Sequence, residues 1–351
     1  MLRKTILSAC VVLAAVIGSV CASSAAGAGE RVLHIYTWSD YLDSDVIHEF
    51  EAANKCRLAI DYFDSNESMY AKLKAGGGGY DIITPSSYMS AIMRKQGMLL
   101  PLNHALLPNL QYMDRNFTKL TEDPEMEYGV PYTRTVTGVG YNAKRVDKKD
   151  LGSWNIFAVP AYSKRMTMLN DMRETIGAAL KYLGYSINTV DEKELAEAGE
   201  VLKGWKRQLA KFDVDEAKIG LASGEFTVIH GYNGDVALIM EENGDIDFFI
   251  PKEGSSLASD DFVVAADTPN GELAHAFINH MLDPEMAVVN MESIRYFMPN
   301  PAAVEKLSDE LRDNRAFNVE DDVLEKCEVI RDLGPENEKY IRIWDLVKAS
   351  D

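Results

Sequence analysis

Hydrophobic residues recur along this chain with two periods, the two-residue period of strands and the 3.6-residue period of amphipathic helices. The strand pattern occurs at residues 32–37, 58–62, 81–84, 166–169, 227–232, 246–250 and 262–265. The helical pattern occurs from about residue 44 and at 64–75, 172–183, 192–212 and 233–242. In the first of these helices, Val46, Phe50 and Ala53 share one face. Strands that alternate with helices through short loops predict an α/β fold with parallel-type sheets covered by helices.

Two longer segments, 129–141 and 248–261, mix polar and apolar residues and contain few residues that break extended structure. We interpret them as connections that run between two lobes, with a binding cleft between the lobes. A chain of 351 residues also exceeds the usual size of a single core. We therefore expect an N-terminal lobe of residues 29–134 plus 256–300 and a C-terminal lobe of residues 135–255 plus 301–351.

The N-terminus has the charge order of a secretory signal peptide, in which Arg3 and Lys4 precede an apolar stretch at 6–20 and a run of small residues. We expect residues 1–28 to be this signal peptide. An alternative is lipoprotein processing at Cys21, although the residues before it match the lipid-attachment consensus poorly. No later segment is long and apolar enough to be a transmembrane helix. A periplasmic protein is therefore expected, lipid-anchored if Cys21 is processed.

The charge balance of the chain is strongly acidic, with a formal net charge of −19. Removing Arg3 and Lys4 from the 36 basic residues leaves 34 against 55 acidic residues, a net charge of −21. Such a protein is a poor partner for nucleic acid and for anionic membrane surfaces, whereas cationic ligands are favoured.

The cysteines and histidines show no metal-binding or redox spacing. Cys10 and Cys21 lie in the signal region, so Cys56 and Cys327 remain, and we favour two lone buried thiols over a disulfide. No H-E-x-x-H or C-x-x-C motif occurs. We expect neither a metal site nor a cofactor.

Trp38-Ser39-Asp40-Tyr41 directly follows the first strand. The C-terminal ends of strands are where open α/β sheets hold their ligands. Aromatic faces beside a carboxylate suit an organic cation, because the acid neutralises the charge and the rings cover the apolar stem. The alternative is a strand end packed by Trp38, with Asp40 capping the next helix.

Further acids occur at element boundaries, where two interpretations compete. Asp171 and Glu174 are three apart at the start of a helix, so both carboxylates share one face, but acids also complement a helix N-terminus. Asp235 ends a strand and could cap the following helix. Asp260 could be half of an acidic surface pair with Asp261.

Seven short motifs add a family resemblance because they occur in order and at family-like intervals. They are Tyr36–Tyr41, Ser65–Glu67 through Lys72-Leu73, Tyr80-Asp81 with Pro85-Ser86, Asn170–Glu174, Asn233–Asp235, Pro251–Gly254 and Pro299-Asn300. With them the chain resembles the periplasmic polyamine-binding proteins, the spermidine/putrescine receptors of ABC importers, over essentially all of its mature length. The resemblance implies a two-lobed α/β periplasmic-binding-protein fold of type II, with two crossing hinge segments and polyamine held between the lobes.

The resemblance also implies roles for individual residues. Asp171 and Glu174 fall on the ligand acids of the family, and Asp260 falls on its central carboxylate. Asp235 matches a carboxylate of the putrescine-type members, with Tyr232 as an aromatic wall. The complete set of expected ligand-binding residues is Trp38, Ser39, Asp40, Tyr41, Ser86, Tyr88, Asp171, Glu174, Tyr232, Asp235, Asp260 and Tyr296.

Three positions depart from the spermidine-type pattern of the family. Ala258 and Tyr232 stand where those members have tryptophan, and a family glutamine falls near Ile330. These losses weaken recognition of a long ligand, whereas Asp40 and Asp235 are the putrescine-type choices. The resemblance therefore favours putrescine over spermidine.

Taken together, we expect a monomeric extracytoplasmic receptor that captures putrescine or spermidine and delivers it to the membrane permease of an ABC importer. Catalysis is not expected, because no G-x-S-x-G motif occurs and the close spacing of Asp171 and Glu174 suits neither glycosidase geometry. Two alternatives remain open. One is a receptor for another small organic cation, and the other is a carboxylate-dependent hydrolase.

Overall fold

The structure is a computed structural model that describes residues 31–119 and 121–350. The expected signal peptide and Cys21 lie outside the described residues. Within this part of the chain the strands are β1 (Arg31–Trp38), β2 (Cys56–Phe63), β3 (Ile82–Ile83), β4 (Gly129–Asn142), β5 (Met166–Met168), β6 (Lys211–Phe212), β7 (Val228–Tyr232), β8 (Ile246–Phe249), β9 (Ser256–Val264) and β10 (Glu328–Val329).

The α-helices alternate with these strands over most of the chain. They are α1 (Ser44–Asn54), α2 (Asn66–Lys74), α3 (Ser87–Lys95), α4 (Arg115–Thr118), α5 (Met172–Leu183), α6 (Glu192–Lys206), α7 (Asp215–Ser223), α8 (Asn233–Glu242), α9 (Gly271–Met281), α10 (Pro284–Ile294), α11 (Pro301–Val304), α12 (Asp309–Asp313), α13 (Asp321–Leu324) and α14 (Asn337–Ala349). None of the helices in the described ranges is long and apolar enough to cross a membrane.

The strands form a sheet in the order β2-β1-β3-β9-β4-β7-β5-β6, with β10 beside β9 and β8 beside β4. Strand β1 pairs in parallel with β2 and β3, and β5 pairs in parallel with β6 and β7. Strands β4 and β9 pair antiparallel with each other and also with β7 and β3, respectively. The α/β class is confirmed. One half of the sheet contains β1, β2 and β3 and the other contains β5, β6 and β7, each set paired in parallel, whereas the central strands β4 and β9 pair antiparallel with each other and with their neighbours β3, β7 and β8.

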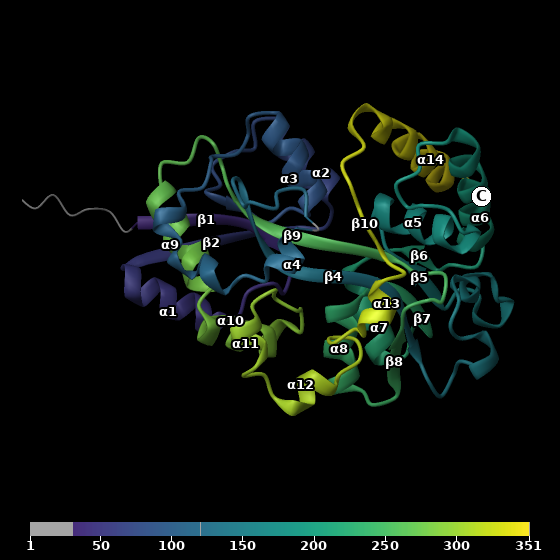
Figure 1. Cartoon of the computed structure of the whole chain (residues 1–351). Coiled ribbons are helices and arrows are strands. Elements are labelled where there is room, and N and C mark those ends of the chain that lie inside the picture. The colour runs from purple at the N-terminus through teal and green to yellow at the C-terminus, as the bar shows by residue number, and fades with distance from the viewer. Residues whose placement is uncertain (1–30, 120, 351) are drawn as a thin grey trace, which may run out of the picture.

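Of the two segments expected as connections, 129–141 is most of strand β4, and 248–261 runs from the end of β8 through a loop into β9. Strands β4 and β9 run side by side through the centre of the molecule (Figure 1). Nearly every residue of both strands is buried. A strand covered on both faces has no polar-out alternation, so its sequence lacks the simple strand period. Some of the polar residues of β4 are threonines whose hydroxyls are hydrogen-bonded, as at Thr133 and Thr137.

Helix α6 ends at Lys206, so the expected helix over 192–212 is six residues too long. The chain turns after Lys206, and Lys211 and Phe212 pair in parallel with Thr167 and Met168 at the edge of the sheet. Edge pairing satisfies backbone groups that a longer helix would have used. In helix α1, Val46 and Phe50 are buried as expected, whereas Ala53 is exposed.

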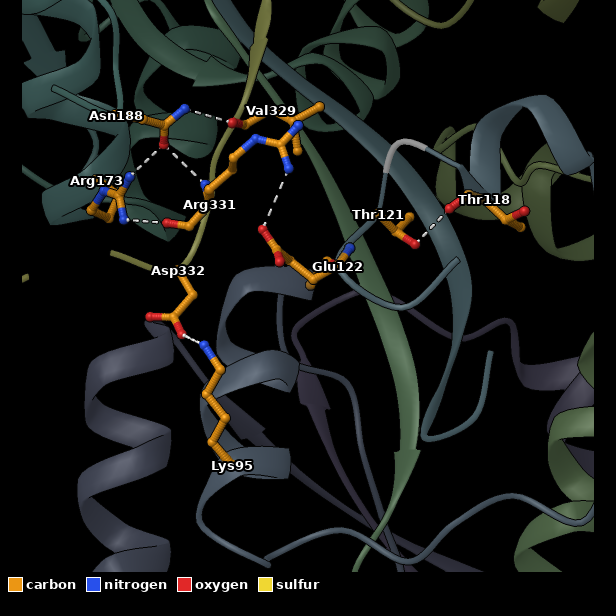
Figure 2. A network of polar contacts seen from close by, with 10 residues as sticks. Lys95, Thr118, Thr121, Glu122, Arg173, Asn188, Val329, Arg331 and Asp332 are labelled. Carbon is orange, nitrogen blue, oxygen red and sulfur yellow. Dashed lines mark hydrogen bonds and ion pairs between the residues drawn. The ribbon is translucent and has the colours of Figure 1, made fainter. Parts of the chain in front are cut away.

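A third segment, residues 328–332, contacts both halves of the molecule (Figure 2). On one side, the Asn188 amide donates to the carbonyl of Val329 at 2.8 Å. On the other side, the Asp332 carboxylate lies 2.5 Å from the ammonium of Lys95 on α3. The segment leads into α14, which packs with α5 and α6. It therefore spans the space between the halves beside β9.

No disulfide joins Cys56 and Cys327 in the described residues, and Cys56 is buried while Cys327 is half-buried. The buried apolar residues of the described chain form three clusters, one of which extends into both halves of the sheet. A cluster around Trp154 and Trp205 fills the space between α5, α6 and the β5 end of the sheet. A second cluster, which contains Phe50 and Phe277, lies beneath β1.

Candidate functional site

A cavity lies between the two halves, at the ends of β1, β2 and β7 and against β9. Eleven of the twelve predicted ligand-binding residues line it. The exception is Asp40, whose side chain is 76% exposed and is not part of the cavity wall. The wall also contains residues that the sequence did not single out as ligand contacts, namely Phe63, Asp64, Asn66, Thr135, Val214, Asp215 and Lys218. Ala258 and Ile330, the two other family departures, line it as well.

Asp260 lies on β9 in the cavity wall, surrounded by hydroxyl donors. Tyr41 Oη donates to Asp260 Oδ2 at 2.5 Å, Ser86 Oγ donates to Oδ1 at 2.7 Å, and Thr133 Oγ1 lies 3.4 Å from Oδ2. Burial raises the pKa of Asp260 from its ordinary value of 3.8 to about 6, although the hydroxyls favour the ionised form. The carboxylate is thus held in place while one of its sides faces the cavity.

Asp261, the next residue, is equally buried but is not in the cavity wall. It accepts a hydrogen bond from Ser259 Oγ at 3.0 Å, and burial raises its pKa to about 7. Successive side chains on a strand point to opposite faces, which separates the two acids. The alternative of an acidic surface pair is therefore wrong, because both carboxylates are inside the protein.

Asp171 and Glu174 stand at the start of α5, and both are buried in the cavity wall. Asp171 is the helix N-cap and accepts from the backbone N–H of Glu174 at 3.0 Å. The Glu174 carboxylate accepts hydrogen bonds from Thr137 Oγ1 at 2.9 Å and from Ser256 Oγ. The capping interpretation of Asp171 is confirmed, and capping leaves its carboxylate at the cavity.

The ionisation of these two acids is opposed by their surroundings. Burial raises the pKa of Asp171, and burial together with the charge of Asp171 raises the pKa of Glu174. Arg173 lies between them in the sequence, but its guanidinium donates to the carbonyl of Arg331 and to the Asn188 side chain, both at 3.0 Å (Figure 2). The positive charge of Arg173 acts to lower the pKa of both acids, but Arg173 is not part of the cavity wall.

A third acid, Glu67 on α2, faces this group from the first half of the chain. Its carboxylate accepts a hydrogen bond from Tyr88 Oη at 3.1 Å. Burial, followed by the charge of Asp171, raises the pKa of Glu67. The sequence analysis placed Glu67 in a family motif and did not name it as a ligand acid. Its position just after the end of β2 was a usable signal, because strand ends were already the expected ligand region.

Another region of the cavity contains Asp235 and Tyr296, and burial together with the charge of Asp235 raises the pKa of the Tyr296 hydroxyl. Asp235 is in the first turn of α8. The preceding residue must be glycine, since a Cβ atom at Gly234 would lie 2.6 Å from the Tyr296 ring. Lys218 on α7 reaches this region and lies 3.7 Å from Asp235 Oδ1. The sequence provided no reason to bring α7 to this position.

Aromatic rings form much of the remaining wall. Trp38 packs on Phe63 with ring centroids 4.4 Å apart, and Tyr41 packs edge-on against Tyr296 at 5.1 Å. Tyr232 ends β7, and burial together with the charge of Asp171 raises the pKa of its hydroxyl. Carboxylates separated by aromatic surface suit a ligand with ammonium groups on an apolar chain. The arrangement therefore suits recognition of such a ligand.

Comparison with known proteins places this geometry in a family. Residues 45–319 match the family described as bacterial extracellular solute-binding protein. The chain is 31% identical to the spermidine/putrescine-binding periplasmic protein of Salmonella typhimurium over 93% of this chain and 94% of that protein.

Two solved structures share the fold and have clear sequence similarity. A lipoprotein of Treponema pallidum superposes with a TM-score of 0.81 and 33% identity, over 90% of this chain and 99% of that chain. The spermidine/putrescine ABC transporter substrate-binding protein PotD of Streptococcus pneumoniae superposes with a TM-score of 0.77 and 29% identity, over 91% of this chain and 99% of that chain. On this evidence the chain belongs to the bacterial extracellular solute-binding proteins.

Proposed function

We propose that this protein is a receptor that holds a polyamine in the cavity between its halves. The observation that carries the proposal is the set of buried carboxylates at Asp171, Glu174 and Asp260. Within the described residues, no lysine or arginine nitrogen lies within 4.0 Å of these three acids. Buried carboxylates are costly to ionise alone, so a cationic ligand between aromatic rings is their natural partner.

The relatives support the same ligand class. The Salmonella protein and the Streptococcus protein are both named for spermidine and putrescine. Putrescine is favoured here because Ala258, Tyr232 and Ile330 line the cavity where a longer amine would need aromatic and polar cover. A missing aromatic wall costs roughly 0.5–2 kcal/mol of cation attraction.

The remaining parts of the proposal follow from a receptor role. The protein acts as a monomer in the periplasm, passes its ligand to the permease of an ABC importer and catalyses no reaction. Processing at Cys21 would add a lipid anchor, as the lipoprotein nature of the Treponema relative suggests. Residues 29–134 plus 256–300 and residues 135–255 plus 301–351 form the two lobes, which close around the ligand about β4 and β9.

A thermal-shift experiment on protein shown to be ligand-free tests the proposal. Putrescine or spermidine should raise the melting temperature, because a ligand that binds only the folded state stabilises it. Neutral sugars and free amino acids should leave the melting temperature unchanged. A flat response to every polyamine would exclude the polyamine class, and turnover in a screen of glycosides and esters would favour the hydrolase alternative.

A further inference from the structure

Lys218 is a cation of the protein itself within the cavity wall. Its ammonium lies 3.4 Å from Asp40 Oδ2, 3.7 Å from Asp215 Oδ1 and 3.7 Å from Asp235 Oδ1. The side chains of Lys218 and Asp235 are 17% and 16% exposed, so this pair is largely removed from solvent, whereas Asp40 and Asp215 are exposed. Three carboxylates therefore surround one internal ammonium.

The charge of Lys218 is maintained at this position. Burial lowers its pKa, but the charges of Asp235, Asp40 and Asp215 act in the opposite direction, and the net effect is a raised pKa. The ammonium therefore stays protonated at neutral pH. Asp40, which the sequence grouped with Asp235 as a ligand acid, takes part in this cluster from outside the cavity wall.

The two regions of the cavity thus differ in charge compensation. Near Asp171 and Glu174, the nearest described cation is Arg173, which is turned toward Arg331 and Asn188. Near Asp235, Lys218 already occupies the position that a ligand ammonium would take. A second ammonium placed there would meet a like charge within a partly buried site, which is unfavourable.

We propose that Lys218 is a specificity-determining residue that occupies the ammonium position beside Asp235 and so limits the ligand to a short diamine. This inference rests on the proposed polyamine function. A diamine has its two ammonium groups near Asp260 and the Asp171–Glu174 pair. A triamine such as spermidine would need a further acid, but the Asp235 carboxylate, which is the largely buried acid of this cluster in the cavity wall, is already paired with Lys218.

The test is calorimetric titration of putrescine and spermidine into the wild-type protein and into Lys218→Met, at one salt concentration. The wild-type protein should bind putrescine at least as tightly as spermidine. The substitution should raise the affinity for spermidine at least about tenfold and that for putrescine less than about threefold. Lys218→Gln, which removes the charge but keeps a polar side chain one atom shorter, should change affinities in the same direction if Lys218→Met folds poorly.

Two further variants make the test specific. Lys144→Met removes the same charge from an exposed ion pair with Asp245 and should change both affinities less than about twofold. Adding Asp235→Asn to Lys218→Met should cancel the gain in spermidine affinity. The gain requires the Asp235 carboxylate, which Lys218→Met leaves without its lysine partner.

The outcomes separate this inference from the proposed function. If Lys218→Met changes the affinities for putrescine and spermidine equally, or lowers both, Lys218 contributes to closure or stability and not to specificity. That result would overturn the inference but leave the proposed polyamine binding intact. Absence of binding of either amine by folded, ligand-free wild-type protein and by both lysine variants would overturn the proposed function itself.

Discussion

At the scale of single residues, Asp260 and Asp261 show how one position along a strand separates two chemically identical side chains. Both are buried on β9, but only Asp260 lines the cavity. Tyr41, Ser86 and Thr133 present their hydroxyls to Asp260 and keep its carboxylate in one orientation. The charge that a ligand meets is therefore positioned before the ligand arrives.

Asp260→Asn should weaken polyamine binding by about 2–5 kcal/mol, because it removes a buried charge that faces an ammonium. Asp261→Asn is the matched control, and since its side chain makes no contact with the cavity it should change binding by less than about 1 kcal/mol. Titration calorimetry of both variants measures the difference. Equal losses, or the reverse order, would show that the wrong acid has been assigned to the ligand.

At the scale of elements, helix α5 and the segment 328–332 support the cavity together. Arg173 of α5 is 1% exposed, and its guanidinium lies 4.7 Å from the Tyr340 ring of α14. It also donates to the carbonyl of Arg331 (Figure 2). By contrast, the Arg331 side chain is 57% exposed and forms one long ion pair with Glu122 at 3.7 Å.

Arg173→Met should therefore lower the free energy of unfolding by about 2–4 kcal/mol, through lost charged hydrogen bonds and loss of the cation behind Asp171 and Glu174. Arg331→Met should lower it by less than about 1 kcal/mol, because exposed ion pairs contribute little. Urea unfolding of both variants provides the comparison. Similar effects of the two substitutions would mean that Arg173 does not anchor this part of the fold.

At the scale of the whole molecule, the buried acids couple stability to pH. Burial raises the pKa of Asp260 from 3.8 to about 6 and that of Asp261 from 3.8 to about 7. The folded state therefore binds more protons than the unfolded state between about pH 4 and 7. The stabilisation associated with these protons is complete below pH 3.8 and is lost as the pH rises through 6 to 7.

The ligand-free protein should accordingly melt roughly 5 °C lower at pH 8 than at pH 5.5. A cationic ligand favours ionised carboxylates, so binding should release protons and the ligand-induced rise in melting temperature should be larger at pH 8. Scanning calorimetry at both pH values tests the first part. Titrations in two buffers of different ionisation enthalpy test the second, and identical heats in both buffers would contradict it.

Much of the local structure was predictable because its signals lie close together in the sequence. Helix α5 has the predicted bounds, since Asp171 caps its start and Gly184, with a φ of 82°, ends it. Helix α8 also has the predicted bounds. The family resemblance identified eleven cavity residues, and for Trp38, Ser39 and Tyr41 the position at the end of a strand pointed to the same region, because the C-terminal ends of strands collect ligand groups in this class of fold.

The tertiary structure decided what depends on partners distant in sequence. Helix α6 stops where the edge of β5 offers backbone pairing to Lys211, which no local pattern reveals. Asp260 rather than Asp261 lines the cavity because β9 pairs with β4 in one register. Lys218 lies beside Asp40, which is 178 residues away in the sequence. Only the folded chain therefore brings this lysine to acids that the sequence analysis expected to bind the ligand. The sequence thus determines the local helices and strands and the residue types at their ends. Which carboxylates in the cavity remain unpaired for a ligand is determined by packing between residues far apart in the sequence.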